Sequence, residues 1–157
     1  MTIGSSEITS QSWLLCRVGT RICALPLEHV VETMRPLPVE PMADAPRCVL
    51  GLCLVRGDPI PAIDLQALFG EPAAKPQRMV TLNVAGRRIA AVVDSVVGVR
   101  AIDPDRFHGL PPLLHDAAGD IVSAVGALDS ELLLFLRAAR LAPQELLDHV
   151  GSTGAGS

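Results

Sequence analysis

Aromatic residues are scarce in this chain: they make up 3% of its 157 residues, and tyrosine is absent. Apolar residues nevertheless account for 49% of the composition, so the core must be built from aliphatic side chains. A chain of this size buries roughly 70% of the surface that its unfolded form exposes. The fold therefore needs neither disulfides nor a metal for its stability.

Basic residues and long apolar runs are also lacking. Lys75 is the single lysine, Arg87 and Arg88 form the only adjacent basic pair, and the formal net charge is −4. A nucleic-acid partner would require a basic face that neutralises phosphates, so we expect none. No window approaches the ~20 apolar residues that span a bilayer, and the N-terminus lacks the basic start and apolar stretch of a signal peptide. We therefore expect a cytoplasmic protein without direct membrane insertion.

Motifs for catalysis and cofactor binding are missing as well, namely the G-x-S-x-G elbow, the Walker loop and the G-x-G-x-x-G fingerprint. Asp64 and Asp94 each end an apolar strand candidate, but neither is followed by the glycine that an aspartic-protease loop needs. We expect both carboxylates to accept backbone N–H groups where strands end. A ligand-binding or enzymatic β-barrel that uses Asp64, Asp94 and His115 is the distant alternative to a protein without catalytic residues or cofactors.

The four cysteines, Cys16, Cys23, Cys48 and Cys53, lie in or at the start of apolar runs. The gaps within the two pairs are six and four residues, whereas zinc sites favour a gap of about two. We expect no metal, and free cysteines that act as small hydrophobic side chains in a reducing compartment.

What the chain does contain is a series of short apolar segments separated by turns. Segment 48–55 is apolar on both faces and predicts a strand covered on both sides. Segment 87–102 is long enough for one bent strand or for two strands, with Gly98 at the bend. About ten short strands without long crossover helices indicate an all-β barrel or sandwich. The expected strands are 13–18, 21–27, 29–35, 48–55, 60–64, 78–85, 87–102, 121–128 and 131–136; a helix is expected over 143–150, and tails over 1–12 and 151–157.

Four stretches, in order, resemble the CheW-like family: GTRICALPLEHVVETM (19–34), VLGLCLVRGDPIPAIDL (49–65), GRRIAAVVDSVVGVRAI (86–102) and VSAVGALDSELLLFL (122–136). The resemblance implies an all-β CheW-like domain over 13–150, with two SH3-like five-stranded β-barrels on a common hydrophobic core and a short C-terminal helix. The first barrel would cover about 18–82. The second would cover about 83–141 together with the first strand.

The same resemblance implies a non-enzymatic adaptor. It would link the cytoplasmic tip of a chemoreceptor (a methyl-accepting chemotaxis protein) to the regulatory domain of the histidine kinase CheA, at receptor arrays on the inner face of the membrane. That regulatory domain has the same fold, so barrel-to-barrel contacts with CheA or with other CheW copies would build rings. An adaptor of the same fold in a non-flagellar pathway for surface sensing, motility or gene regulation is the alternative that the sequence leaves open.

Arg56 ends an apolar run, where a buried charge is costly unless it is paired. Glu32, in another apolar strand, is the expected partner in a two-pronged ion pair. The pair is a structural strut in one interpretation, and in the other it also shapes a groove for the receptor. Nearby, Gly51 predicts a bulge or a close backbone approach, and Gly57 predicts a turn with positive φ.

Apolar side chains supply the expected docking surfaces, with core packing as the alternative for each. The resemblance places the kinase on a surface formed by Val31, Met34, Leu37 and Val39. A receptor tip is a helical hairpin, which calls for an apolar groove. The residues expected to line that groove are Val96, Val97, Val99 and Arg56.

Overall fold

The computed structural model describes residues 11–72, 75–109 and 121–141, and most of them lie in β-strands. Helical structure in these residues is limited to the single turn α2 (Leu65–Leu68) and the 3-10 turns η1 (Leu27–His29), η2 (Pro104–Arg106) and η4 (Ala138–Arg140). The all-β prediction is confirmed. The strands are β1 (Gln11–Val18), β2 (Arg21–Pro26), β3 (Val30–Met34), β4 (Val49–Val55), β5 (Asp58–Asp64), β6 (Arg78–Val84), β7 (Arg87–Val93), β8 (Ser95–Ile102), β9 (Val122–Leu128) and β10 (Glu131–Leu136).

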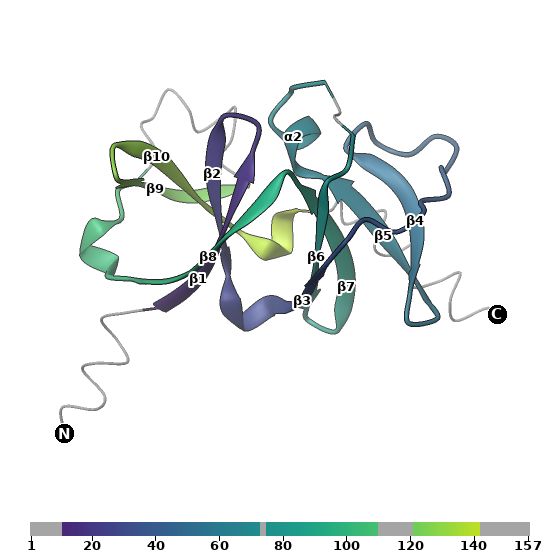
Figure 1. The fold of residues 1–157 in the computed structure, drawn as a ribbon, viewed down its shortest axis with the longest axis horizontal. Helices are drawn as coiled ribbons and strands as arrows, with labels where there is room; N and C mark the ends of the chain where they lie inside the picture. The colour runs from purple at the N-terminus through teal and green to yellow at the C-terminus, as the bar shows by residue number, and fades with distance from the viewer. Residues whose placement is uncertain (1–10, 73–74, 110–120, 142–157) are drawn as a thin grey trace.

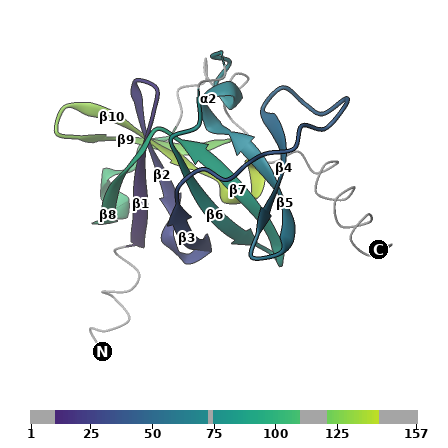
Figure 2. The ribbon, with the colours of Figure 1, turned by 45° about the vertical axis from the view of Figure 1, so that its right-hand side comes forward.

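These strands form two five-stranded sheets that make up two adjacent lobes (Figure 1). Sheet A has the order β8-β1-β2-β10-β9, and sheet B has the order β3-β6-β7-β5-β4. Figure 2 shows sheet B with β3 and β4 on its opposite sides.

Central strands are apolar on both faces because each face meets a different core. In β1, Trp13 and Leu15 point into a core that sheet A encloses, whereas Leu14 and Cys16 point into a core shared by the two sheets. Strand β7 alternates in the same way between the core of sheet B and the shared core. The shared aliphatic core expected from the sequence is therefore present.

The two sheets repeat one topology in circularly permuted order. Replacing β3, β4, β5, β6 and β7 by β8, β9, β10, β1 and β2 converts the strand order of sheet B into that of sheet A. Each sheet also has a loop residue that bridges one edge strand: Glu40 bridges Leu52 on β4, and His108 bridges Val125 on β9. The chain thus begins in sheet A, builds the whole of sheet B, and returns to complete sheet A.

Two strands, β2 and β7, belong to other units than the expected division into barrels predicts. The expected division assigns 21–26 to the first barrel and 87–93 to the second. In the structure β2 pairs with β1 and β10 in sheet A, and β7 pairs with β5 and β6 in sheet B. The reason is that the tight β1–β2 and β6–β7 hairpins stay whole, and each lies at the centre of its sheet.

Asp94, and not Gly98, separates the two strands of the segment 87–102. The Asp94 carboxylate accepts the N–H of Gly19 at 2.8 Å, and its own N–H donates to the carbonyl of Arg17 at 2.9 Å. These bonds hold the corner where the chain leaves sheet B for sheet A. Strand β1 begins at Gln11, before the expected 13, so the predicted tail over 1–12 is wrong at residues 11 and 12. The rest of that tail, the predicted tail over 151–157 and the predicted helix over 143–150 lie outside the described residues.

All four cysteines are buried and free. Burial raises the pKa of the Cys16 and Cys23 thiols to about 12, and it also raises the pKa of Cys48 and Cys53. Thiols of this kind are protonated and unreactive at neutral pH. They fill space in the cores, as the sequence predicts.

Gly51 lies where the loop after β3 meets the edge of β4. Its φ is +143°, and a Cβ at this position would lie 2.0 Å from the backbone oxygen of Glu40. The register also shifts between Val49 and Gly51, so Val49 faces the shared core while Cys53 faces the core of sheet B. The sequence leaves a bulge and a close backbone approach open as alternatives, and the structure has both.

The substitution Gly51→Ala should destabilise the fold by more than the roughly 1–3 kcal/mol that a sparsely populated backbone conformation alone costs, because its Cβ also collides with Glu40. Gly57→Ala is the matched control, since Gly57 has a φ of +87° but a Cβ added there would meet no atom within 4 Å. Denaturant titration of both variants measures the difference in the free energy of unfolding. Equal losses would contradict the close approach at Gly51.

Candidate functional site

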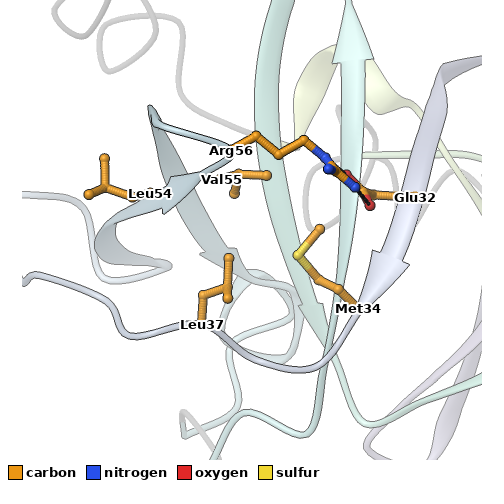
Figure 3. A pocket seen from close by; sticks show the side chains of 6 residues that line it. All are labelled: Glu32, Met34, Leu37, Leu54, Val55 and Arg56. Carbon is orange, nitrogen blue, oxygen red and sulfur yellow. Dashed lines mark hydrogen bonds and ion pairs between the residues drawn. The ribbon is translucent and has the colours of Figure 1, made fainter.

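Sheet B has two edge strands, β3 and β4, at opposite ends of its strand order. Among the described residues no ladder joins these edges, because β3 pairs with β6 and β4 pairs with β5. One ion pair spans the gap between them (Figure 3). Arg56 Nε donates to Glu32 Oε2 at 3.0 Å, and Arg56 Nη2 donates to Glu32 Oε1 at 2.9 Å. The structure thus brings together the two charges that the sequence predicts as a two-pronged pair.

The position of Arg56 follows from the β4–β5 turn. Arg56 and Gly57 are its two central residues, closed by the pair Val55–Asp58, and their φ values are 53° and 87°. Two positive φ values match the twist of the flanking strands in a two-residue hairpin, so the predicted positive φ at Gly57 is confirmed. From this turn the Arg56 side chain reaches across to β3 (Figure 3).

The expectation that Arg56 is buried is wrong. Its side chain is 72% exposed and that of Glu32 is 26% exposed, because Arg56 lies in the turn and not in the strand. The hydrogen bond from Arg56 lowers the pKa of the Glu32 carboxyl, and the positive charges of Arg56 and Arg88 act in the same direction. Both groups are charged at neutral pH. Solvent screens an exposed pair of this kind, so it adds little to stability.

A pocket of about 280 Å³ opens beside the ion pair. Apolar side chains form most of its wall, and the charged pair forms one side (Figure 3). Its volume lies just below the roughly 300–1,000 Å³ of small-molecule sites, and it suits one or two side chains of a protein partner. The lining residues come from both edges and the loop between them: Glu32, Met34, Leu37, Leu54, Val55 and Arg56.

Two further charges lie near the ion pair. Arg88 on β7 and Asp58 at the start of β5 are 3.9 Å apart, measured from Nη1 to Oδ2. Arg88 also acts electrostatically on Glu32. The pocket is therefore flanked by charges of both signs.

The residues predicted to dock the kinase divide into three groups. Met34 and Leu37 line the pocket. Val39 is half-buried against the core of sheet B, and Val31 is 43% exposed at a bulge in β3. Sequence reasoning missed Leu54, which is 67% exposed, because an apolar run does not reveal that its strand lies at the edge of a sheet.

The residues predicted for the receptor groove do not all come together. Val96 packs against the shared core, while Val97 and Val99 are 46% and 53% exposed on β8, an edge strand of sheet A. Arg56 lies in sheet B and contributes to the pocket there. The surface formed by Val97 and Val99 is therefore separate from the pocket lining.

Asp64 and Asp94, the two carboxylates that an enzymatic β-barrel would use, accept backbone N–H groups in the structure. Asp64 caps α2 by accepting the N–H of Gln66 at 3.0 Å, and Asp94 accepts that of Gly19; this is the role expected for both. His115 lies outside the described residues. Within 11–72, 75–109 and 121–141 no three His, Cys, Asp or Glu side chains form a metal site. No helix in the same ranges has the length and apolar character needed to span a membrane.

Comparisons with known proteins agree on one family. The family model of the CheW-like domain matches residues 12–146. The chain is 32% identical over 131 residues to protein FrzA of Myxococcus xanthus, covering 79% of this chain and 81% of that protein. It is 24% identical over 150 residues to the chemotaxis protein CheW of Rhizobium meliloti, covering 92% and 97%. An 88-residue stretch, 52% of this chain, is 33% identical to 13% of the chemotaxis protein CheA of Klebsiella aerogenes.

The crystal structure of the scaffolding protein TtCheW from Thermoanaerobacter tengcongensis is similar, with a TM-score of 0.72 at 20% identity; the match covers 81% of this chain and 88% of that one. At this identity the likeness concerns the fold, and it confirms the predicted architecture of two SH3-like units. The permuted pair of sheets, the match over 12–146 and the relative at 32% identity lead to one conclusion: this chain belongs to the CheW-like family.

Proposed function

We propose that this protein is a non-enzymatic adaptor of chemotaxis signalling that couples chemoreceptors to the histidine kinase CheA. The regulatory domain of the kinase docks at the pocket between β3 and β4. The observation that carries this assignment is the pocket itself, where an apolar wall lies beside an exposed leucine and an ion pair of little value for stability. Such a mixture of apolar centre and charged rim is typical of protein interfaces.

The similarity to part of CheA supports the choice of partner. A kinase that carries a stretch similar to this chain can present the same kind of sheet edge and turn. Two related domains then meet through related surfaces, as subunits of oligomers do.

For the receptor tip we propose the outer surface of β8. Val97 and Val99 expose apolar side chains there, and Val96 anchors the strand on the shared core. A helical hairpin supplies apolar side chains at helical spacing, which suits a shallow apolar surface of this kind. Because this surface and the pocket belong to different sheets, the two partners can bind at once.

The permuted repeat supports assembly into rings with CheA or with other copies of this protein. Each sheet ends in an edge strand and a two-residue turn, and the position of Arg56 in sheet B corresponds to Asp129 in sheet A. A molecule with two such ends can contact one neighbour at each end, and head-to-tail contacts of this kind close into rings. We place these assemblies in the cytoplasm, at receptor arrays on the inner face of the membrane.

A non-flagellar signalling pathway is a second candidate for the pathway in which this adaptor acts. The relatives include both a chemotaxis protein CheW and the protein FrzA, so the similarity is compatible with an adaptor of the same fold in a non-flagellar pathway. The docking pocket and its test are the same in both cases.

The substitution Leu54→Glu should weaken binding of the isolated CheA regulatory domain by about tenfold or more, because it puts a charge into an apolar contact. Ala85→Glu is the control, since it puts the same charge on an exposed apolar residue of the same sheet, in the turn between β6 and β7 and outside the pocket lining. Its affinity should stay within about twofold of the parent. Titration calorimetry with the kinase domain from the same organism measures these Kd values. An unchanged Kd for Leu54→Glu would contradict docking at the pocket.

A further inference from the structure

The β4–β5 turn has a residue that its backbone disfavours. A two-residue hairpin turn with two positive φ values favours asparagine or glycine at its first position, since other residues pay a steric cost there. Arg56 occupies that position with a φ of 53°. Sheet B contains a second turn of the same geometry, with Ala85 at 54° and Gly86 at 81°, which serves as an internal reference.

The ion pair with Glu32 does not explain why arginine occupies the turn. The Arg56 side chain is 72% exposed, and solvent-exposed ion pairs are screened and add little to stability. The strain at the backbone and the gain from the pair are therefore of similar size. Stability alone therefore gives arginine no advantage over asparagine at this position.

The guanidinium has hydrogen-bonding capacity left over. It carries five N–H donors, and Glu32 takes one from Nε and one from Nη2. This engagement fixes the plane of the guanidinium and leaves three N–H groups, of which two, one on each Nη, lie in parallel on its other edge. The two oxygens of Glu32 are occupied by the pair, and Asp58, in the same turn, lies near Arg88.

We propose that Arg56 serves recognition and not hairpin stability, and that its free edge binds a carboxylate of the partner that docks at the pocket. The partner segment carries an acidic residue beside the apolar side chain that enters the pocket. Glu32 is the positioning residue, because it fixes the plane in which Arg56 offers a second two-pronged contact. This inference rests on the proposed function, and it adds the chemistry by which the partner is chosen.

The test compares Arg56→Asn with Ala85→Asn. Both substitutions put an asparagine before a glycine in the same kind of turn. Ala85→Asn should raise the melting temperature by about 1–4 °C, and Arg56→Asn, which also loses the ion pair, should keep it at or above that of the parent. Arg56→Asn should also weaken binding of the CheA regulatory domain by roughly tenfold or more, whereas Ala85→Asn should leave the Kd unchanged. Arg56→Lys keeps the charge but lacks the planar fork, and it should lose most of the affinity that Arg56→Asn loses.

The melting temperatures and Kd values together distinguish a role of Arg56 in partner recognition from a role in stabilising the fold. A melting temperature for Arg56→Asn at or above that of the parent, together with weakened binding, supports the inference. A fall in the melting temperature of Arg56→Asn, with a rise for Ala85→Asn, would show that Arg56 is a strut and overturn it. An unchanged Kd for Arg56→Asn or full affinity for Arg56→Lys would also overturn it, while the result for Leu54→Glu still decides separately whether the pocket docks the kinase.

Discussion

In the part of the chain that the structure describes, each five-stranded sheet has two edge strands that no ladder joins, and this constraint shapes both halves of the molecule. In sheet B the ion pair of Arg56 and Glu32 spans the gap and leaves a pocket beside it. Sheet A fills its interior in another way: Phe107 packs on Trp13 and Phe135, with ring centroids 5.8 Å and 4.2 Å apart. Three of the four aromatic residues thus lie in the core of sheet A, and sheet B retains the opening proposed for docking.

The permuted repeat gives the protein two equivalent ends. The edge strands β3 and β8 occupy equivalent places, and each carries a bulge that leaves a valine exposed, Val31 in β3 and Val97 in β8. Bulges and added twist are a common means of keeping sheet edges from uncontrolled pairing. Here they also turn apolar side chains outward, onto the surfaces that we propose for docking.

Local patterns in the sequence were sufficient to predict most strands and the ion pair. Gly57 marks a turn, and Arg56 and Glu32 stood out as opposite charges in apolar segments. The membership of the sheets was not predictable in this way, because the parallel pairs β2–β10 and β5–β7 join segments far apart in the chain and leave no signal in local periodicity. The exposure of Leu54 was missed for a related reason: whether an apolar strand is central or at an edge depends on its neighbours, which the strand's own residues do not specify.

The family assignment and the pocket lead to one central claim: a partner domain docks across the gap between β3 and β4. Amide hydrogen exchange of the full chain, with and without the CheA regulatory domain, tests this claim most directly. The account predicts slower exchange in segments 31–37 and 52–58 on binding, with little change at the β6–β7 turn. Binding that leaves both segments unprotected, and protects only strands of sheet A, would contradict it.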